Sequence, residues 1–155
     1  MKGPTAFDIT TAHILRVSSL LDEARDELHY RAISHDSSKY DLIEAGPLQD
    51  MQDLINREGP AAYGTEEYKR RTALLGPMLE HHYANNTHHP EHYPNGVAGM
   101  DLFDLMEMFF DWKAASERGA ESSMNLSFSV KKYDIPPMLE SILRNTASRL
   151  KYEVR

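Results

Sequence analysis

The spacing of apolar residues constrains the fold of this chain more than any other feature of its sequence. Near the N-terminus they recur at intervals of three and four residues, at Ile14, Val17, Leu21, Ala24 and Leu28. This spacing is typical of one face of an α-helix, which has 3.6 residues per turn. Helical segments of this kind follow one another along the chain, and the sequence therefore predicts an all-α fold of about six helices.

The expected helices are bounded by residues that cap or interrupt a helix. A first helix begins near Asp8, and Asp22 with Glu23 is expected to open a second helix that ends at His35 and Asp36. Later helices are expected over 41–56, with a break or bend near 46–47, over 65–89, with a bend near 76–77, and over 100–117 and 136–150. Apolar residues alternate over 124–130, which indicates an extended segment or a helix whose periodicity is indistinct. Together these elements are expected to form a single domain over residues 1–155.

The composition limits the kinds of partner and site. The chain has no cysteine, so a metal ion would have to be held by His, Asp and Glu. The formal net charge of −7 argues against nucleic acid as a partner, because neutralising phosphates requires a basic surface. No apolar run has the length of a membrane span, and the first residues lack the apolar stretch of a secretory signal. We therefore expect a cytoplasmic enzyme with no membrane partner.

Histidines are concentrated in one short segment. Five of the eight fall within twelve residues, at His81, His82, His88, His89 and His92. If the helix extends as far as Pro90, His82 and His89 share one of its faces, and His81 and His88 share the neighbouring face. Imidazole is a common ligand of transition metals, so the segment indicates a metal site. A histidine-rich surface loop with incidental metal affinity is the alternative.

A second candidate lies at the dipeptide His35-Asp36, which is expected to end a helix. Both side chains could bind one metal ion where the chain turns. Lys39 follows three residues later and could bind a phosphate group. His13 lies 22 residues before His35 on the apolar side of the first helix, where it is either a further ligand or a buried core histidine.

The third candidate is the apolar helix expected from residue 100. Asp104, Glu107 and Asp111 are spaced by three and four residues, so they share one face of this helix. Burying unpaired carboxylates is costly, so they require cations as partners. A metal site would supply these, and so would Lys or Arg side chains at a helix–helix interface.

The order of these motifs resembles the HD superfamily of metal-dependent phosphohydrolases, in which an early His is followed by an HD pair, further histidines and a late Asp. The run 35–39, HDSSK, is similar to the HDxGK element of the HD-GYP phosphodiesterases, with Ser38 in place of the Gly. Residues 93–94 share only part of the Gly-Tyr-Pro signature. Over roughly residues 9–118 the chain also resembles a phage and bacterial family without an established substrate, whose patterns are HDxSK, HHYxxNxHHPEH and MxLxDLxEMxxDWKAA.

This resemblance implies an HD-type helical bundle that binds a divalent metal. The implied ligands are His13, His35, Asp36 and one of Asp104 and Asp111, with Asp104 preferred. The five clustered histidines, together with Asp111, would complete a second metal site or contact the substrate phosphate. His and Asp ligands accept Mn, Fe, Co, Ni or Zn, and Mg is an alternative.

The expected activity is hydrolysis of a small nucleotide, a nucleoside mono- or triphosphate, by a metal-activated water that attacks phosphorus. Asp36, Lys39 and Glu107 are the expected catalytic residues, and Glu44 is an alternative to Glu107 as general acid or base. One alternative function is a phosphodiesterase of a cyclic or oligomeric nucleotide signal. The other is a helical binding protein that keeps a metal for stability without turnover. The helix expected at 100–112 is rich in Met and Phe, and this surplus of apolar side chains is compatible with an interface in a homo-oligomer.

Overall fold

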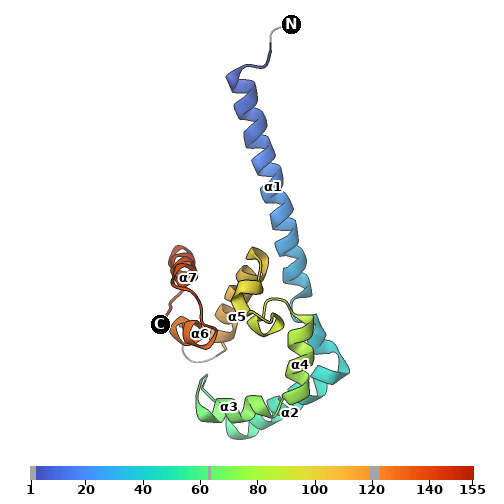
Figure 1. The fold of residues 1–155 in the computed structure, drawn as a ribbon. Coiled ribbons are helices and arrows are strands. Elements are labelled where there is room, and N and C mark those ends of the chain that lie inside the picture. Colours follow the sequence, from blue (N-terminus) through green and yellow to red (C-terminus); the bar gives the residue numbers. More distant parts are fainter. Residues whose placement is uncertain (1–2, 63, 119–122) are drawn as a thin grey trace. The chain divides into compact units, whose positions relative to one another are not determined.

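The computed structural model describes residues 3–62, 64–118 and 123–155. Over these residues the chain is all-helical, with seven α-helices and three short 3₁₀ helices (Figure 1). The prediction of an all-α fold is confirmed, with one α-helix more than the six expected. The chain divides into two compact units, Met1–His35 (unit 1) and Asp36–Arg155 (unit 2).

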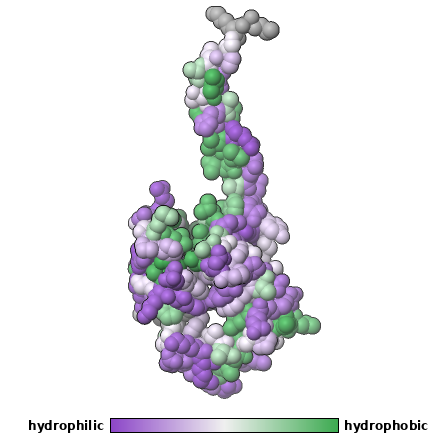
Figure 2. Space-filling model, viewed as in Figure 1, coloured by the Kyte–Doolittle hydropathy of each residue, from purple (hydrophilic) through white to green (hydrophobic). Residues whose placement is uncertain are grey.

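Unit 1 consists of one long helix, α1 (Ala6–Ser34). Thr5 caps its start, because the Asp8 backbone N–H donates to Thr5 Oγ1 at 3.2 Å and the Thr5 N–H donates to the Asp8 carboxylate at 2.8 Å. Figure 2 shows hydrophobic and hydrophilic residues on different sides of the middle of this helix. Neither α1 nor another helix of the described residues combines the length and the hydropathy needed to cross a membrane.

The prediction of a helix break at Asp22 and Glu23 is wrong. Both carboxylates lie on the surface of the continuous helix, where Asp22 pairs with Arg25 at 2.8 Å and Glu23 pairs with Arg16 at 3.3 Å. No Gly or Pro falls within this stretch, so nothing interrupts the helical hydrogen bonds. The two acidic residues therefore act as partners along the helix and not as caps.

Unit 2 begins with the short 3₁₀ helix η1 (Ser37–Tyr40), followed by α2 (Leu42–Glu58). Helix α2 runs through Gly46 and Pro47 without the expected break. The helix expected over 65–89 is in fact two helices, α3 (Glu66–Ala73) and α4 (Gly76–Asn85). Helix α4 packs against both α2 and η1, and this packing positions the candidate site.

Helix α4 ends four residues earlier than predicted because two asparagine side chains bind its last carbonyl groups. The Asn85 amide donates to the carbonyl of His81, and the Asn86 amide donates to the carbonyl of His82, both at 2.8 Å. The following segment contains the 3₁₀ helices η2 (Pro90–His92) and η3 (Gly96–Gly99). His88 and His89 therefore lie beyond the helix, and the expected pairing of histidines on two helical faces is wrong.

The apolar core of unit 2 lies among α5 (Leu102–Ser116), α6 (Leu126–Lys132) and α7 (Pro137–Leu150). Its buried members are Phe109, Met124, Leu126, Ile135, Leu143 and Ala147. Of the two alternatives for residues 124–130, the helix is the one observed, because α6 begins at Leu126, and the extended backbone is limited to a parallel bridge between Met124 and Val154. This core holds α5, whose acidic residues face the candidate site.

Candidate metal centre

Asp36 occupies the turn between unit 1 and η1 and has a left-handed backbone, with φ of 54°. Aspartate is one of the few residues that adopt this conformation readily. Its Oδ2 atom forms an ion pair with Lys39. Its Oδ1 atom lies 3.3 Å from Nε2 of His82 and 3.5 Å from Nε2 of His88. One carboxylate oxygen thus faces two imidazole nitrogens.

Glu44, in the first turn of α2, fixes the proton positions of two histidines. It is fully buried, with Oε1 at 2.7 Å from His81 Nδ1 and Oε2 at 2.9 Å from His82 Nδ1. Burial by itself would raise the pKa of Glu44, but hydrogen bonds from His81, Ser38 and His82 outweigh it and lower the pKa. A carboxylate accepts hydrogen bonds, so both rings donate from Nδ1, and in the neutral form of each ring Nε2 is then the atom that can bind a metal.

Ser38 and Asn86 hold His82 in place. The Asn86 amide donates to Ser38 Oγ at 2.7 Å and to the His82 carbonyl at 2.8 Å. All three residues are buried, and they join η1 to the end of α4. The orientation of the His82 ring is therefore set by contacts from η1, α2 and α4.

His89 completes a close group with His82 and Asp36. The Nε2 atoms of His82 and His89 are 2.9 Å apart. This is the distance of a hydrogen bond between the two rings, and an ion bound by both nitrogens at about 2.1 Å would replace it with a separation of about 3.0–3.4 Å. Burial, reinforced by the neighbouring His88 and His82, lowers the pKa of His89 to about 3. His89 is therefore neutral near pH 7, as a metal ligand must be.

His88 has its own orienting carboxylate. Its Nδ1 atom lies 3.1 Å from Oε1 of Glu107 on α5, and the His88 side chain is 2% exposed. With Nδ1 beside Glu107, the Nε2 atom of His88 lies 3.5 Å from Oδ1 of Asp36. In metal-binding histidines, the ring nitrogen that does not bind the metal usually donates a hydrogen bond to a group such as a carboxylate. Asp111, also on α5, places a further negative charge near His89.

These residues form what we call the histidine–aspartate cluster, made of Asp36, His82, His88 and His89. One ligand atom from each of Asp36, His82 and His89 lies within 4.8 Å of the others. Neutral imidazoles with one carboxylate suit Mn, Fe, Co, Ni and Zn. The donor set and the fixed ring protons therefore fit a divalent transition metal.

Asp104 was predicted as a metal ligand, but its carboxylate oxygens accept hydrogen bonds from neighbouring residues. It is 2% exposed; its Oδ1 atom accepts from the Thr87 hydroxyl at 2.6 Å, and its Oδ2 atom accepts from the Tyr93 hydroxyl at 2.6 Å. It also forms the capping box of α5 with Asp101. Burial, together with the bond to Asp104, raises the pKa of Tyr93 to about 12, so this donor stays protonated. Of the two alternatives, Asp111 is the one whose charge acts on the cluster.

His13 and His35 do not lie near one another. They are separated by 22 positions along the continuous helix α1, of which His35 is the C-cap. At 1.5 Å per residue this places them about 33 Å apart. The prediction that both bind one ion within a single chain is therefore wrong, because the expected turn between them does not exist. His35 keeps its position directly before Asp36.

The other clustered histidines have different roles. His81 binds Glu44 through Nδ1 and is 27% exposed. His92 donates from Nδ1 to the carbonyl of Tyr83 at 2.7 Å, which ties the segment after α4 back to that helix. The supporting contacts of Ser38 and Asn86, and the binding of two rings by Glu44, were not foreseen. The asparagine pair at 85–86 is the sequence signal that could have revealed the helix end.

A family model described as a family of unknown function, DUF5662, matches residues 4–149, and the chain therefore belongs to this family. The match includes every residue of the histidine–aspartate cluster and both orienting glutamates. Comparison with curated proteins gave no match, and comparison with solved structures gave none.

Proposed function

We propose that this member of DUF5662 is a metal-dependent phosphohydrolase of the HD type that acts on a small nucleotide. The observation that supports it is the position of Asp36, whose Oδ1 atom faces the Nε2 atoms of His82 and His88 at 3.3 Å and 3.5 Å. This aspartate is the second residue of the HD pair, and the resemblance to HD enzymes assigns metal binding to that position. His35 also stays a predicted ligand on the same basis.

In this proposal Asp36, His82, His88 and His89 hold a divalent metal, and Glu44 and Glu107 orient the rings. When bound, such an ion lowers the pKa of a coordinated water and stabilises negative charge on a phosphoryl group. Lys39, which pairs with Asp36, supplies a positive charge for a substrate phosphate. Of the rings that contact a glutamate, His81 is the most exposed, at 27%.

The proposal is tested by phosphate release from nucleoside mono- and triphosphates and cyclic nucleotides with added Mn, Co, Ni or Mg. We expect metal-dependent release by the wild type and none by Asp36→Asn. Asp41→Asn is the matched control, because Asp41 is an exposed aspartate five positions later whose side chain makes no capping hydrogen bond. Release that is equal in both variants would contradict the proposal.

A structural metal is the second candidate, and the burial of the cluster favours it. His82 and His88 are only 5% and 2% exposed, and a structural site is typically closed, whereas a catalytic site keeps a position open to water. In that case the metal-loaded chain releases phosphate from none of the nucleotides, and a chelator lowers its melting temperature. Because a bound ion stabilises the fold in either case, it is the phosphate release that separates the two functions.

A further inference from the structure

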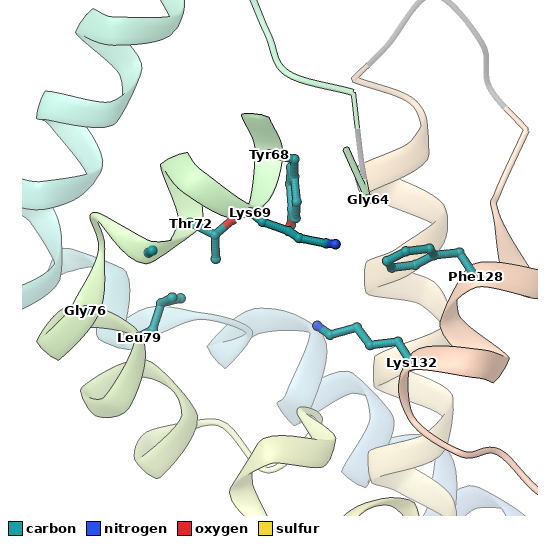
Figure 3. A pocket seen from close by; sticks show the side chains of 9 residues that line it. Gly64, Tyr68, Lys69, Thr72, Gly76, Leu79, Phe128 and Lys132 are labelled. Atoms are coloured by element: carbon teal, nitrogen blue, oxygen red, sulfur yellow. The ribbon is translucent and has the colours of Figure 1, made fainter. Parts of the chain in front are cut away.

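A cavity of about 440 Å³ lies elsewhere in unit 2, between α3, the start of α4 and α6. Its walls are mainly apolar, with the rings of Tyr68 and Phe128 and the side chain of Leu79 (Figure 3). The volume is in the range of pockets that bind small molecules. None of the residues that line it belongs to the histidine–aspartate cluster.

Two lysines give this apolar cavity a positive rim. Lys69 from α3 and Lys132 from α6 extend toward the same opening (Figure 3). Lys69 pairs with Glu66 at 2.6 Å, where the two side chains are 60% and 89% exposed, and Lys132 pairs with Glu91 at 3.2 Å. Exposed ion pairs contribute little to stability, so Lys69 can exchange Glu66 for an anionic ligand. Lys132 also donates to the Tyr133 hydroxyl at 2.6 Å, and its ammonium group has three N–H donors to share among its partners and a ligand.

The Phe128 ring is held at the edge of the cavity by Gly64. This glycine has φ of +84°, and a Cβ atom at its position would lie 2.7 Å from Cε2 of Phe128. The backbone at 64 thus approaches the ring more closely than any other residue would allow. A side chain at position 64 would displace the Phe128 ring, so the ring takes its place in the cavity wall because this residue is glycine.

We propose that this cavity binds a small aromatic phosphate of the size of a nucleoside monophosphate. Its planar ring lies against Phe128 and Tyr68, and its phosphate lies between Lys69 and Lys132. The aromatic wall recognises the ring through stacking, and the lysines recognise the anion through charge. This inference does not depend on the proposed hydrolase activity, because it uses none of the residues assigned to the metal.

The test is calorimetric titration of the full chain with AMP, without added metal, followed by adenosine alone and inorganic phosphate alone. We expect AMP to bind saturably. Adenosine alone and phosphate alone should each bind at least about tenfold more weakly, because each keeps only one of the two kinds of contact. Repeating the AMP titration with Asp36→Asn separates this site from the metal centre, and we expect the same affinity. No saturable binding of AMP up to about 10 mM would overturn the inference.

Two variants assign the binding to the cavity. Lys132→Gln is expected to weaken AMP binding about three- to fivefold, the effect of losing one exposed charge contact. Lys131→Gln is the matched control, since Lys131 precedes it on α6 but does not line the cavity, and we expect no change. Phe128→Ala is expected to weaken binding about tenfold through loss of stacking. Equal effects of the two lysine variants would overturn the assignment.

Discussion

The Nδ1 atom of His82 lies 2.9 Å from Oε2 of Glu44, although the two residues are 38 positions apart in the sequence. This hydrogen bond places a proton of His82 on Nδ1, and in the neutral ring it leaves Nε2, which faces Asp36, as the atom that can bind a metal. The tautomer that metal binding requires is thus set by a carboxylate on another helix. The arrangement makes Glu44 a positioning residue for the cluster.

Glu44→Gln is expected to weaken metal affinity by about 10- to 100-fold, the usual effect of losing an orienting carboxylate. The amide cannot accept from two Nδ1–H groups with both of its polar atoms, so one ring loses its fixed proton position. Competition with a chromogenic chelator measures the affinity. Glu80→Gln is the control, because Glu80 is an exposed glutamate on α4, and an unchanged affinity in Glu44→Gln would refute the role given to it.

Metal binding is expected to stabilise the fold of unit 2. At a free metal concentration of about 100 times the Kd, binding adds about 2.7 kcal/mol to the free energy of unfolding. For a unit of this size that corresponds to an increase in melting temperature of about 10 °C. Thermal unfolding with and without metal measures the shift, and Asp36→Asn should abolish most of it. A shift of the same size in this variant would place the metal elsewhere.

The helices could be predicted where the apolar spacing was regular and the ends carried clear caps. Helix α5 begins two residues after the expected start, because Asp101 and Asp104 form a capping box there. Helix α1 was expected to begin near Asp8, but Thr5 is its cap and Asp8 is the N3 partner in the capping box, so the helix begins two residues earlier, at Ala6. At Asp22 and Glu23 the same residue types that cap a helix served as surface partners of arginines, and sequence spacing alone does not distinguish these two uses.

The residues of the candidate site were predicted from the sequence, but the contacts between them were not. His82, His88, His89 and Asp36 were all recognised as candidate residues, yet their relation depends on where α4 ends and on how it packs against α2 and η1. Glu44 gave no local signal of its role, since a single glutamate in the first turn of a helix is common. Asp104 and Asp111 share a helical face, and only the contacts to Thr87 and Tyr93 separate them.

Asp104→Ala is expected to lower stability without removing metal binding. The substitution takes away the acceptor of two partly buried hydroxyl hydrogen bonds and breaks the capping box of α5. We expect a loss of about 2–4 kcal/mol in the free energy of unfolding, measured by urea denaturation. Metal stoichiometry should remain that of the wild type, and its loss in the folded variant would restore Asp104 as a ligand.

Asp111→Asn provides the contrasting case on the same helix. The negative charge of Asp111 acts on His89, so its removal should weaken metal affinity several-fold while the capping of α5 stays intact. The chelator competition described for Glu44 measures this change. A variant that matches the wild type in affinity would show that Asp111 has no part in the centre.

In the presence of a chelator, the stability of the chain is expected to fall as the pH falls below about 6.5. The folded state lowers the pKa of His89 to about 3 from its ordinary value of 6.5, so between these values the unfolded chain binds a proton that the folded chain does not. The lowered pKa of Glu44 acts in the same direction at more acidic pH, where protonation of the unfolded carboxylate favours unfolding. Each such group contributes a slope of up to about 1.4 kcal/mol per pH unit.

Urea denaturation at pH 7.5, 6.5 and 5.5 measures this dependence. His89→Gln should flatten the decrease between pH 6.5 and 5.5, because glutamine does not titrate. His29→Gln, which changes a histidine of α1 in unit 1, should retain it. If His89→Gln shows the same slope as the wild type, the burial of His89 is not the source of the acid sensitivity, and its neutral state near pH 7 would need another explanation.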